Sequence, residues 1–93
     1  MERNKIMICV LDGNEILDKK MLHDILAASL NFPHWYGRNL DALYDCLTDL
    51  GEDAEIRFLH EDILKEHLGE YTQSLIKVIH MSAKENTHIH VSL

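Results

Sequence analysis

Three aspartates, Asp41, Asp45 and Asp49, recur at four-residue intervals near the middle of the chain. At about 100° per residue, a helix places their carboxylates in one row. The apolar side of the same helix would be formed by Leu40, Leu43, Cys46, Leu47 and Leu50. Like charges at this spacing weaken a helix by about 0.2–0.5 kcal/mol per pair. Carboxylates so placed can act as general acid and base, or can pair with Arg and Lys of another protein, so the row is the first candidate site.

Aromatic residues accompany this row. Trp35 and Tyr36 precede it directly, and Tyr44 lies within it. Rigid rings beside carboxylates are typical of protein interfaces, where the rings supply contact area and the charges pair with basic residues. Because successive loop residues seldom point the same way, we expect one of the first two rings to fill the core, and we assign that role to Tyr36. The pattern favours a protein-binding face.

Two other kinds of site are consistent with single features of the sequence. Asp41 and Asp45 could form the carboxylate pair of a small enzyme, but the sequence has no nucleophile motif or phosphate-binding loop, and a single 93-residue core leaves little room for a cleft. His88 and His90 could place two imidazoles on one strand face, yet no third ligand follows at a suitable spacing. We therefore predict no catalytic residues, no metal and no cofactor, with a small enzyme as the weaker alternative.

Strands and helices must position these residues, and the sequence predicts both. Short apolar runs bounded by turn residues predict strands over residues 5–11, 54–60 and 87–93. Apolar residues at helical spacing predict helices over residues 19–30 and 40–50, a short helix around 63–64 and a longer one ending near 86. Helical crossovers give parallel pairing. The sequence therefore predicts an α/β fold in which a small three-stranded parallel sheet is packed by about four helices, with residues 1–93 in a single domain.

Other residues are assigned structural roles. In the first predicted helix, the polar residues Lys19, Lys20, His23 and Asp24 are expected on the solvent face. Pro33 and Gly37 interrupt the helical pattern and predict a loop over residues 31–38. Cys9 and Cys46 lie in apolar stretches without close spacing, so we expect both to be buried thiols.

Charge is unevenly distributed along the chain. The sequence has nine Lys and Arg against sixteen Asp and Glu, and residues 41–70 hold ten of the acids with only Arg57 and Lys65 as bases. This balance repels nucleic acid and anionic membranes and attracts basic partners, so we expect one acidic surface and no direct contact with nucleic acid or membranes. The apolar run of residues 6–11 is too short for a signal peptide or a membrane span, and we expect a cytoplasmic protein.

The run from Pro33 to Thr48 reads Pro-His-Trp-Tyr-Gly-Arg-Asn-Leu-Asp-Ala-Leu-Tyr-Asp-Cys-Leu-Thr. It closely resembles the central loop and helix of the barstar family, and the predicted order of elements is similar over nearly the whole chain. Barstar is an intracellular inhibitor of the secreted bacterial ribonuclease barnase. The resemblance implies a loop and second helix that plug a ribonuclease active site, with acidic side chains standing where the RNA phosphates would lie.

Residue roles follow from the resemblance by matching position. Asp45 is similar to the central carboxylate that meets the Arg and His cluster of the ribonuclease, and Asp41 to its supporting acid. Trp35 takes the place of a tyrosine that packs against the catalytic histidine. The implied partner-binding residues are Trp35, Asn39, Leu40, Asp41, Tyr44, Asp45, Leu50 and Met81.

Three further positions depart from the family pattern. Tyr44 replaces a tryptophan, which reduces contact area, and Arg38 and Met81 stand in place of acids, which lowers the negative field. These differences leave the identity of the partner open, because charges that an interface lacks also determine specificity. We expect a monomer that binds a basic ribonuclease, either one like barnase or a toxin for which this chain is the immunity protein. A generic acidic interaction module is the alternative.

Overall fold

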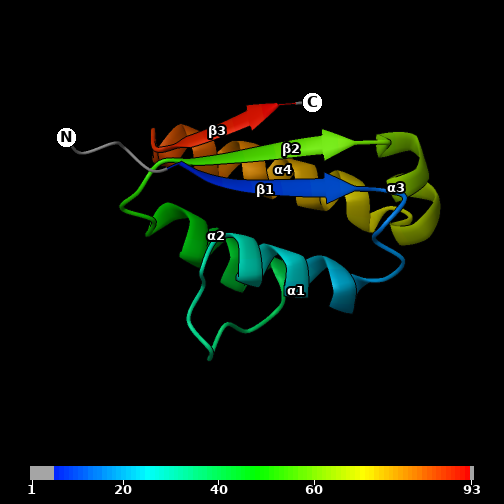
Figure 1. Ribbon diagram of the computed structural model, residues 1–93, viewed down its shortest axis with the longest axis horizontal. Coiled ribbons are helices and arrows are strands. Elements are labelled where there is room, and N and C mark those ends of the chain that lie inside the picture. The colour runs from blue at the N-terminus through cyan, green and yellow to red at the C-terminus, as the bar shows by residue number, and fades with distance from the viewer. Residues whose placement is uncertain (1–5, 93) are drawn as a thin grey trace.

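The computed structural model describes residues 6–92 of the chain, and Figure 1 shows the arrangement of its elements. They are β1 (Met7–Asp12), α1 (Lys19–Ser29), α2 (Leu40–Thr48), β2 (Ala54–Leu59), α3 (Glu61–Leu68), α4 (Tyr71–Glu85) and β3 (Ile89–Ser92). The strands form one sheet in the order β1-β2-β3, and both pairings are parallel. The predicted α/β fold, with three parallel strands and four helices, is confirmed. Residues 5 and 93, which the sequence assigns to strands, lie outside the described residues.

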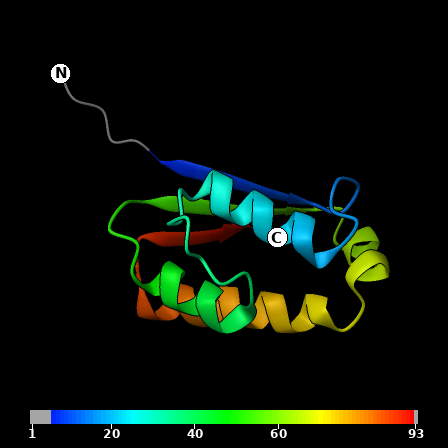
Figure 2. The same ribbon diagram turned by 90° about the horizontal axis from the view of Figure 1, so that it is seen from below.

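The sheet is covered by helices on one face. Its buried side chains on that face include Cys9, Leu11, Ile56, Phe58 and Ile89. α1 packs against β1, α4 packs against β3, and α2 lies against α4, as Figure 2 shows from below. The opposite face leaves Ile8, Val10 and Leu59 exposed, which is unusual because parallel sheets are mostly buried on both faces.

α2 is held by side chains at both ends. At its start, Oδ1 of Asn39 accepts a hydrogen bond from the Ala42 N–H at 2.7 Å and so caps the helix. The helix ends at Thr48, two residues before the end that the sequence predicts. There the amide of Asn86, between α4 and β3, donates to the carbonyl of Leu47 at the end of the helix and to that of Leu50 just after it. Contacts distant in sequence thus fix the end of α2.

The ends of β1 and β2 meet at a turn that requires glycine. The Gly13 N–H donates to the Leu59 carbonyl at 2.8 Å, and a Cβ atom on Gly13 would overlap backbone atoms of His60 and Leu64. β2 ends at Leu59, one residue earlier than predicted, because His60 adopts a φ of 53° and leads into α3. Because glycine has no Cβ atom, the start of α3 can pack directly against this turn.

Two side chains differ in burial from the sequence prediction. His23, expected on the solvent face of α1, is 1% exposed. Both of its ring nitrogens lie within hydrogen-bond distance of tyrosine hydroxyls, which offsets the loss of water. Cys9 is buried as predicted. Cys46 is only half-buried, because it lies at the border of the buried face of α2 and lines a groove.

The acidic residues between positions 41 and 70 lie on several elements of the fold. One group lies along α2, while Glu61 and Asp62 open α3. In Figure 1, α3 lies beyond the tip of β2 and α2 lies toward its start.

Candidate functional site

The loop of residues 31–38 buries one aromatic side chain and exposes the next. Tyr36 is 6% exposed and packs against Phe32, with ring centroids 4.9 Å apart. Trp35 is 73% exposed. The prediction that Tyr36 fills the core is confirmed, and its neighbour is left to solvent.

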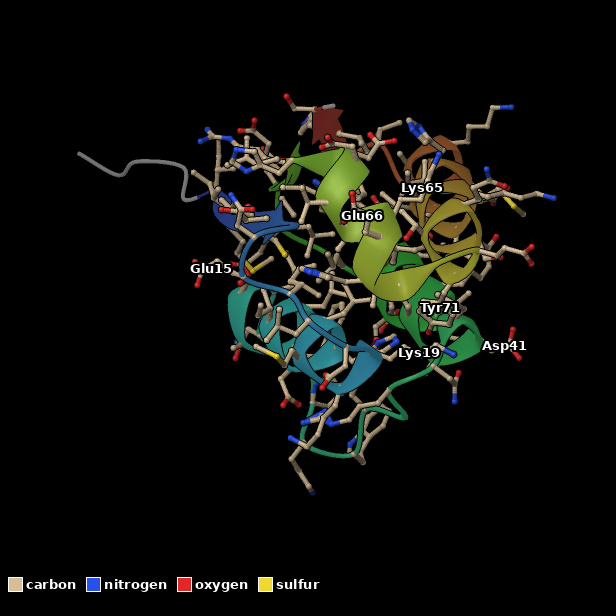
Figure 3. The ribbon with its side chains drawn as sticks, turned by 90° about the vertical axis from the view of Figure 1, so that its right-hand side faces the viewer. Glu15, Lys19, Asp41, Lys65, Glu66 and Tyr71 are labelled. Atoms are coloured by element: carbon tan, nitrogen blue, oxygen red, sulfur yellow. The ribbon has the colours of Figure 1, made fainter. Side chains whose placement is uncertain are left out.

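The three aspartates of the acidic row are all exposed, with Asp41 and Asp45 on α2 and Asp49 at its C-cap. Within residues 6–92, no Lys, Arg or His nitrogen lies within 4.0 Å of their carboxylates. Figure 3 shows Asp41 directed away from the body of the molecule. Their charges are therefore available to another molecule.

A groove of about 620 Å³ separates the loop from the C-terminal half of α2, and we name it the tryptophan groove. It is lined by Asn31, Phe32, Pro33, Trp35, Asp45, Cys46, Thr48, Asp49, Leu50 and Gly51. Partial burial, followed by the carboxylates of Asp45 and Asp49, raises the pKa of the Cys46 thiol. The groove thus combines apolar walls with a negative field, which suits a ring or aliphatic chain that carries a positive charge.

A second groove, of about 470 Å³, lies between α2 and α4, and we name it the methionine groove. It is lined by Leu40, Asp41, Tyr44, Asp45, Val78 and Met81. Met81 is 45% exposed. Asp45 lines both grooves and therefore lies at their common boundary.

Seven of the eight predicted partner-binding residues meet at these grooves. Trp35, Asp45 and Leu50 line the tryptophan groove, and Leu40, Asp41, Tyr44, Asp45 and Met81 line the methionine groove. Asn39 lines neither groove. Its Nδ2 donates to the Gly37 carbonyl at 3.3 Å while its Oδ1 caps α2, so it fixes the junction of loop and helix.

Other groove residues were not predicted as partner-binding. Thr48 and Asp49 follow Asp45 by three and four residues, so helical spacing places them beside it and could have identified them. Val78 precedes Met81 by three residues and shares its side of α4 for the same reason. Residues 31–33 lie in a loop, where no periodic signal exists.

Asn86 fixes the end of α2 that carries the acidic row. It is 8% exposed, and its Nδ2 donates to the carbonyl groups of Leu47 at 3.0 Å and Leu50 at 2.9 Å. Its Oδ1 accepts from the His88 N–H at 3.0 Å. One buried amide therefore joins α2 to the connection between α4 and β3.

Metal and membrane features were also sought in the described part of the chain. Residues 6–92 hold no group of three His, Cys, Asp or Glu side chains arranged to bind a metal ion. His88, one of two histidines considered as ligands, lies with Nδ1 2.9 Å from a carboxylate oxygen of Asp53. None of the helices in this range is long and apolar enough to cross a membrane.

Comparison with known proteins identifies the family of the chain. The family model described as Barstar (barnase inhibitor) matches residues 6–93. A protein of Bacillus subtilis (strain 168) named "Putative ribonuclease inhibitor YrdF" is 37% identical over 79 residues, which cover 82% of this chain and 85% of that protein. With three parallel strands, four helices and a family match over nearly its full length, the chain belongs to the barstar family.

Proposed function

We propose that this chain inhibits a basic ribonuclease by filling its active site with the carboxylates of α2 and the loop of residues 31–38. Membership of the barstar family and similarity to a protein named as a ribonuclease inhibitor support the inhibitor role. The proposed mode of binding depends chiefly on Asp45, which is exposed, without a cation partner among residues 6–92, and bordered by two grooves.

The physical basis is charge complementarity. A ribonuclease holds cationic side chains where it binds the phosphates and stabilises the transition state. In the proposed complex, the Asp45 and Asp41 carboxylates pair with those cations, and Trp35 covers apolar surface nearby. RNA is then excluded by occupancy, and the inhibitor performs no chemical step.

The proposal extends to the biological setting. The inhibitor acts as a monomer in the cytoplasm, where it protects the cell from a ribonuclease before export or from an incoming ribonuclease toxin. Both settings require the same face.

The test compares the parent protein with Asp45→Asn and with Asp62→Asn, an aspartate of α3 that is also exposed. Each immobilised protein is exposed to culture medium or extract of the source, eluted with salt, and the eluate is assayed for RNA cleavage. We expect the parent and Asp62→Asn to retain a basic ribonuclease and to abolish its activity at equimolar amounts. For Asp45→Asn we expect inhibition weaker by about 10–100-fold, from the loss of a charged hydrogen bond of about 1.5–3 kcal/mol.

Two outcomes contradict the proposal. Retention of a basic protein that does not cleave RNA would indicate a generic acidic interaction module. Equal inhibition by both variants would show that the blocking surface lies away from Asp45.

A further inference from the structure

The C-terminal end of α2 is not neutralised by a basic residue of its own. The last turn of this helix has no base, and Asp49 forms its C-cap. Because the peptide dipoles of a helix add to a negative pole at this end, a carboxylate is unfavourable here and a cation is favourable. Asp45 lies one turn earlier, and like charges at this spacing repel each other. The chain therefore concentrates negative charge at a place that suits a cation from outside.

This end of α2 forms one side of the tryptophan groove. Asp45, Cys46, Thr48 and Asp49 line the groove from the helix, and Trp35 lines it from the loop. None of the ten lining residues is Lys, Arg or His. Partial burial and then the two carboxylates raise the pKa of the Cys46 thiol, so both charges act on the same part of the groove.

The other walls of the groove also favour a cation on an aliphatic stem. Trp35 is 73% exposed, and the face of an indole ring attracts cations more strongly than other aromatic rings do. Oγ1 of Thr48 donates its proton to the Tyr44 carbonyl at 2.8 Å, so toward the groove it can only accept. Phe32 and Leu50 supply apolar surface that a stem of methylene groups can cover.

We propose that the tryptophan groove takes an arginine side chain of the ribonuclease, with its guanidinium between Asp45 and Asp49 and its plane against Trp35. Asp49 is then a specificity-determining residue, in addition to the residues that the sequence predicts to bind the partner. The inference rests on the proposed function, because it names the chemical group that enters one part of the same face.

Arginine fits this groove better than lysine. Residues four apart on a helix have Cβ atoms about 5–6 Å apart, and a guanidinium with five N–H donors can bond both carboxylates at once. Its flat, weakly hydrated surface also stacks on an aromatic ring. An ammonium is compact and strongly hydrated, so it gains less from Trp35 and loses more water on entry.

The first measurement uses the inhibitor alone, with argininamide and lysinamide as probes of similar charge. Trp35 is the single tryptophan of the sequence, so its indole N–H signal in NMR and its fluorescence report on the groove. We expect argininamide to shift the Trp35 signal at lower concentrations than lysinamide does. Asp49→Asn should weaken the binding of argininamide about two- to fivefold, as for the loss of an exposed ion pair.

The chain offers a matched control and a check on folding. Glu52 is an exposed acid three residues after Asp49 that does not line the groove, so Glu52→Gln should bind argininamide nearly as the parent does. Asp49→Asn removes repulsion with Asp45 and an unfavourable charge at the helix end, so we expect its urea midpoint to be at least that of the parent. Weaker binding by this variant then cannot result from unfolding.

The second measurement is affinity for the captured ribonuclease. We expect Asp49→Asn to bind about tenfold more weakly, as for the loss of a charged hydrogen bond, and Glu52→Gln to bind within about twofold of the parent. Trp35→Leu keeps an apolar side chain but removes the indole ring. If Trp35 and Asp49 hold the same arginine, the double variant should lose less binding free energy than the two single variants together.

Several results would overturn the inference. Equal responses to argininamide and lysinamide would contradict the choice of arginine, and equal binding of argininamide by the parent and Asp49→Asn would contradict the role of Asp49. Additive losses in the double variant would show that Trp35 and Asp49 contact different groups of the partner. If Asp45→Asn weakens inhibition and Asp49→Asn does not, the proposed function stands and this inference fails. If no ribonuclease is inhibited, the probe titration still decides whether the groove binds a guanidinium.

Discussion

Nη2 of Arg38 lies 3.1 Å from Oδ1 of Asp24, so the cation just before α2 is paired with α1 rather than with the acidic row. Asp24 also binds Lys20 Nζ at 2.8 Å, and this hydrogen bond, together with the nearby Arg38, lowers the pKa of its carboxyl group. By the sequence resemblance alone, an acid was expected at the position of Arg38. The ion pair explains how an arginine is tolerated there without cancelling the charge of the neighbouring helix.

Releasing this arginine should slow binding to a basic partner. Asp24→Asn removes one negative charge and frees Arg38 beside Asp41, so we expect association about two- to threefold slower at low salt. The double variant Asp24→Asn with Arg38→Gln should recover the parent rate. Stopped-flow kinetics at two salt concentrations measure both, and a double variant as slow as the single one would contradict the pairing.

Asn86→Ala should destabilise the fold. The substitution leaves the carbonyl groups of Leu47 and Leu50 without their buried donor, so we expect the free energy of unfolding to fall by about 2 kcal/mol. Thr87→Ala, at the exposed next position, serves as the control. Urea denaturation measures the difference, and similar midpoints for the two variants would show that water replaces the amide.

Gly13 and Gly51 should respond differently to an added methyl group. Gly13→Ala forces Cβ against the backbone of His60 and Leu64, and we expect a loss of about 3 kcal/mol or more. Gly51→Ala meets no atom within 4 Å, and we expect a change below about 0.5 kcal/mol. Thermal and urea unfolding test this contrast, which equal stability of the two variants would refute.

Met81→Ala should weaken partner binding without unfolding the inhibitor. Met81 is 45% exposed, so the isolated protein loses little on truncation, whereas a complex that covers the methionine groove loses about 1 kcal/mol, or about fivefold in affinity. His80→Ala, on the same helix but outside the groove, is the control. Calorimetric titration with the ribonuclease provides the measurement, and an unchanged dissociation constant would place the partner away from this groove.

Stability should decrease as the pH falls below about 6.5. The pKa of His23 is lower in the folded protein than its ordinary value of 6.5, so in that range the unfolded chain binds more protons and unfolding becomes easier. Asp12 and Asp24, whose pKa values are lowered from 3.8, stay ionised down to pH 5 and add no slope there. Urea denaturation between pH 8 and pH 5 should show the decrease in the parent.

Two variants isolate the contribution of His23 to that slope. His23→Gln keeps an amide that can accept from one tyrosine and donate to the other, but it cannot titrate, so we expect a flatter dependence on pH. His34→Gln, an exposed histidine in the loop, should retain the slope of the parent. An identical slope in His23→Gln would assign the acid sensitivity to another group.

Most of the fold could be predicted because its signals are local. Apolar runs ended by turn residues gave the strands, and apolar residues at helical spacing gave the helices. The errors lie at ends that distant contacts decide. α2 stops at Thr48, where the Asn86 amide donates to the Leu47 carbonyl, and β2 stops before His60, whose backbone turns into α3.

The site residues that could be predicted lie mostly in one continuous stretch of sequence. The acidic row and Trp35 lie within one continuous stretch, and matching positions in the barstar family add Met81 from α4. The buried state of His23 depends on tyrosines 13 and 48 residues away, so no pattern within α1 reveals it. The two grooves likewise exist only because the loop and α4 flank opposite sides of α2.

The position of Asp45 between the two grooves restricts the shape of any partner that uses both. Such a partner needs two protrusions with a recess between them, and a cation at the base of that recess. An enzyme cleft with raised walls has this shape, whereas a flat or convex surface does not. The shape of this face would therefore exclude many positively charged proteins that electrostatic attraction alone would bring to α2.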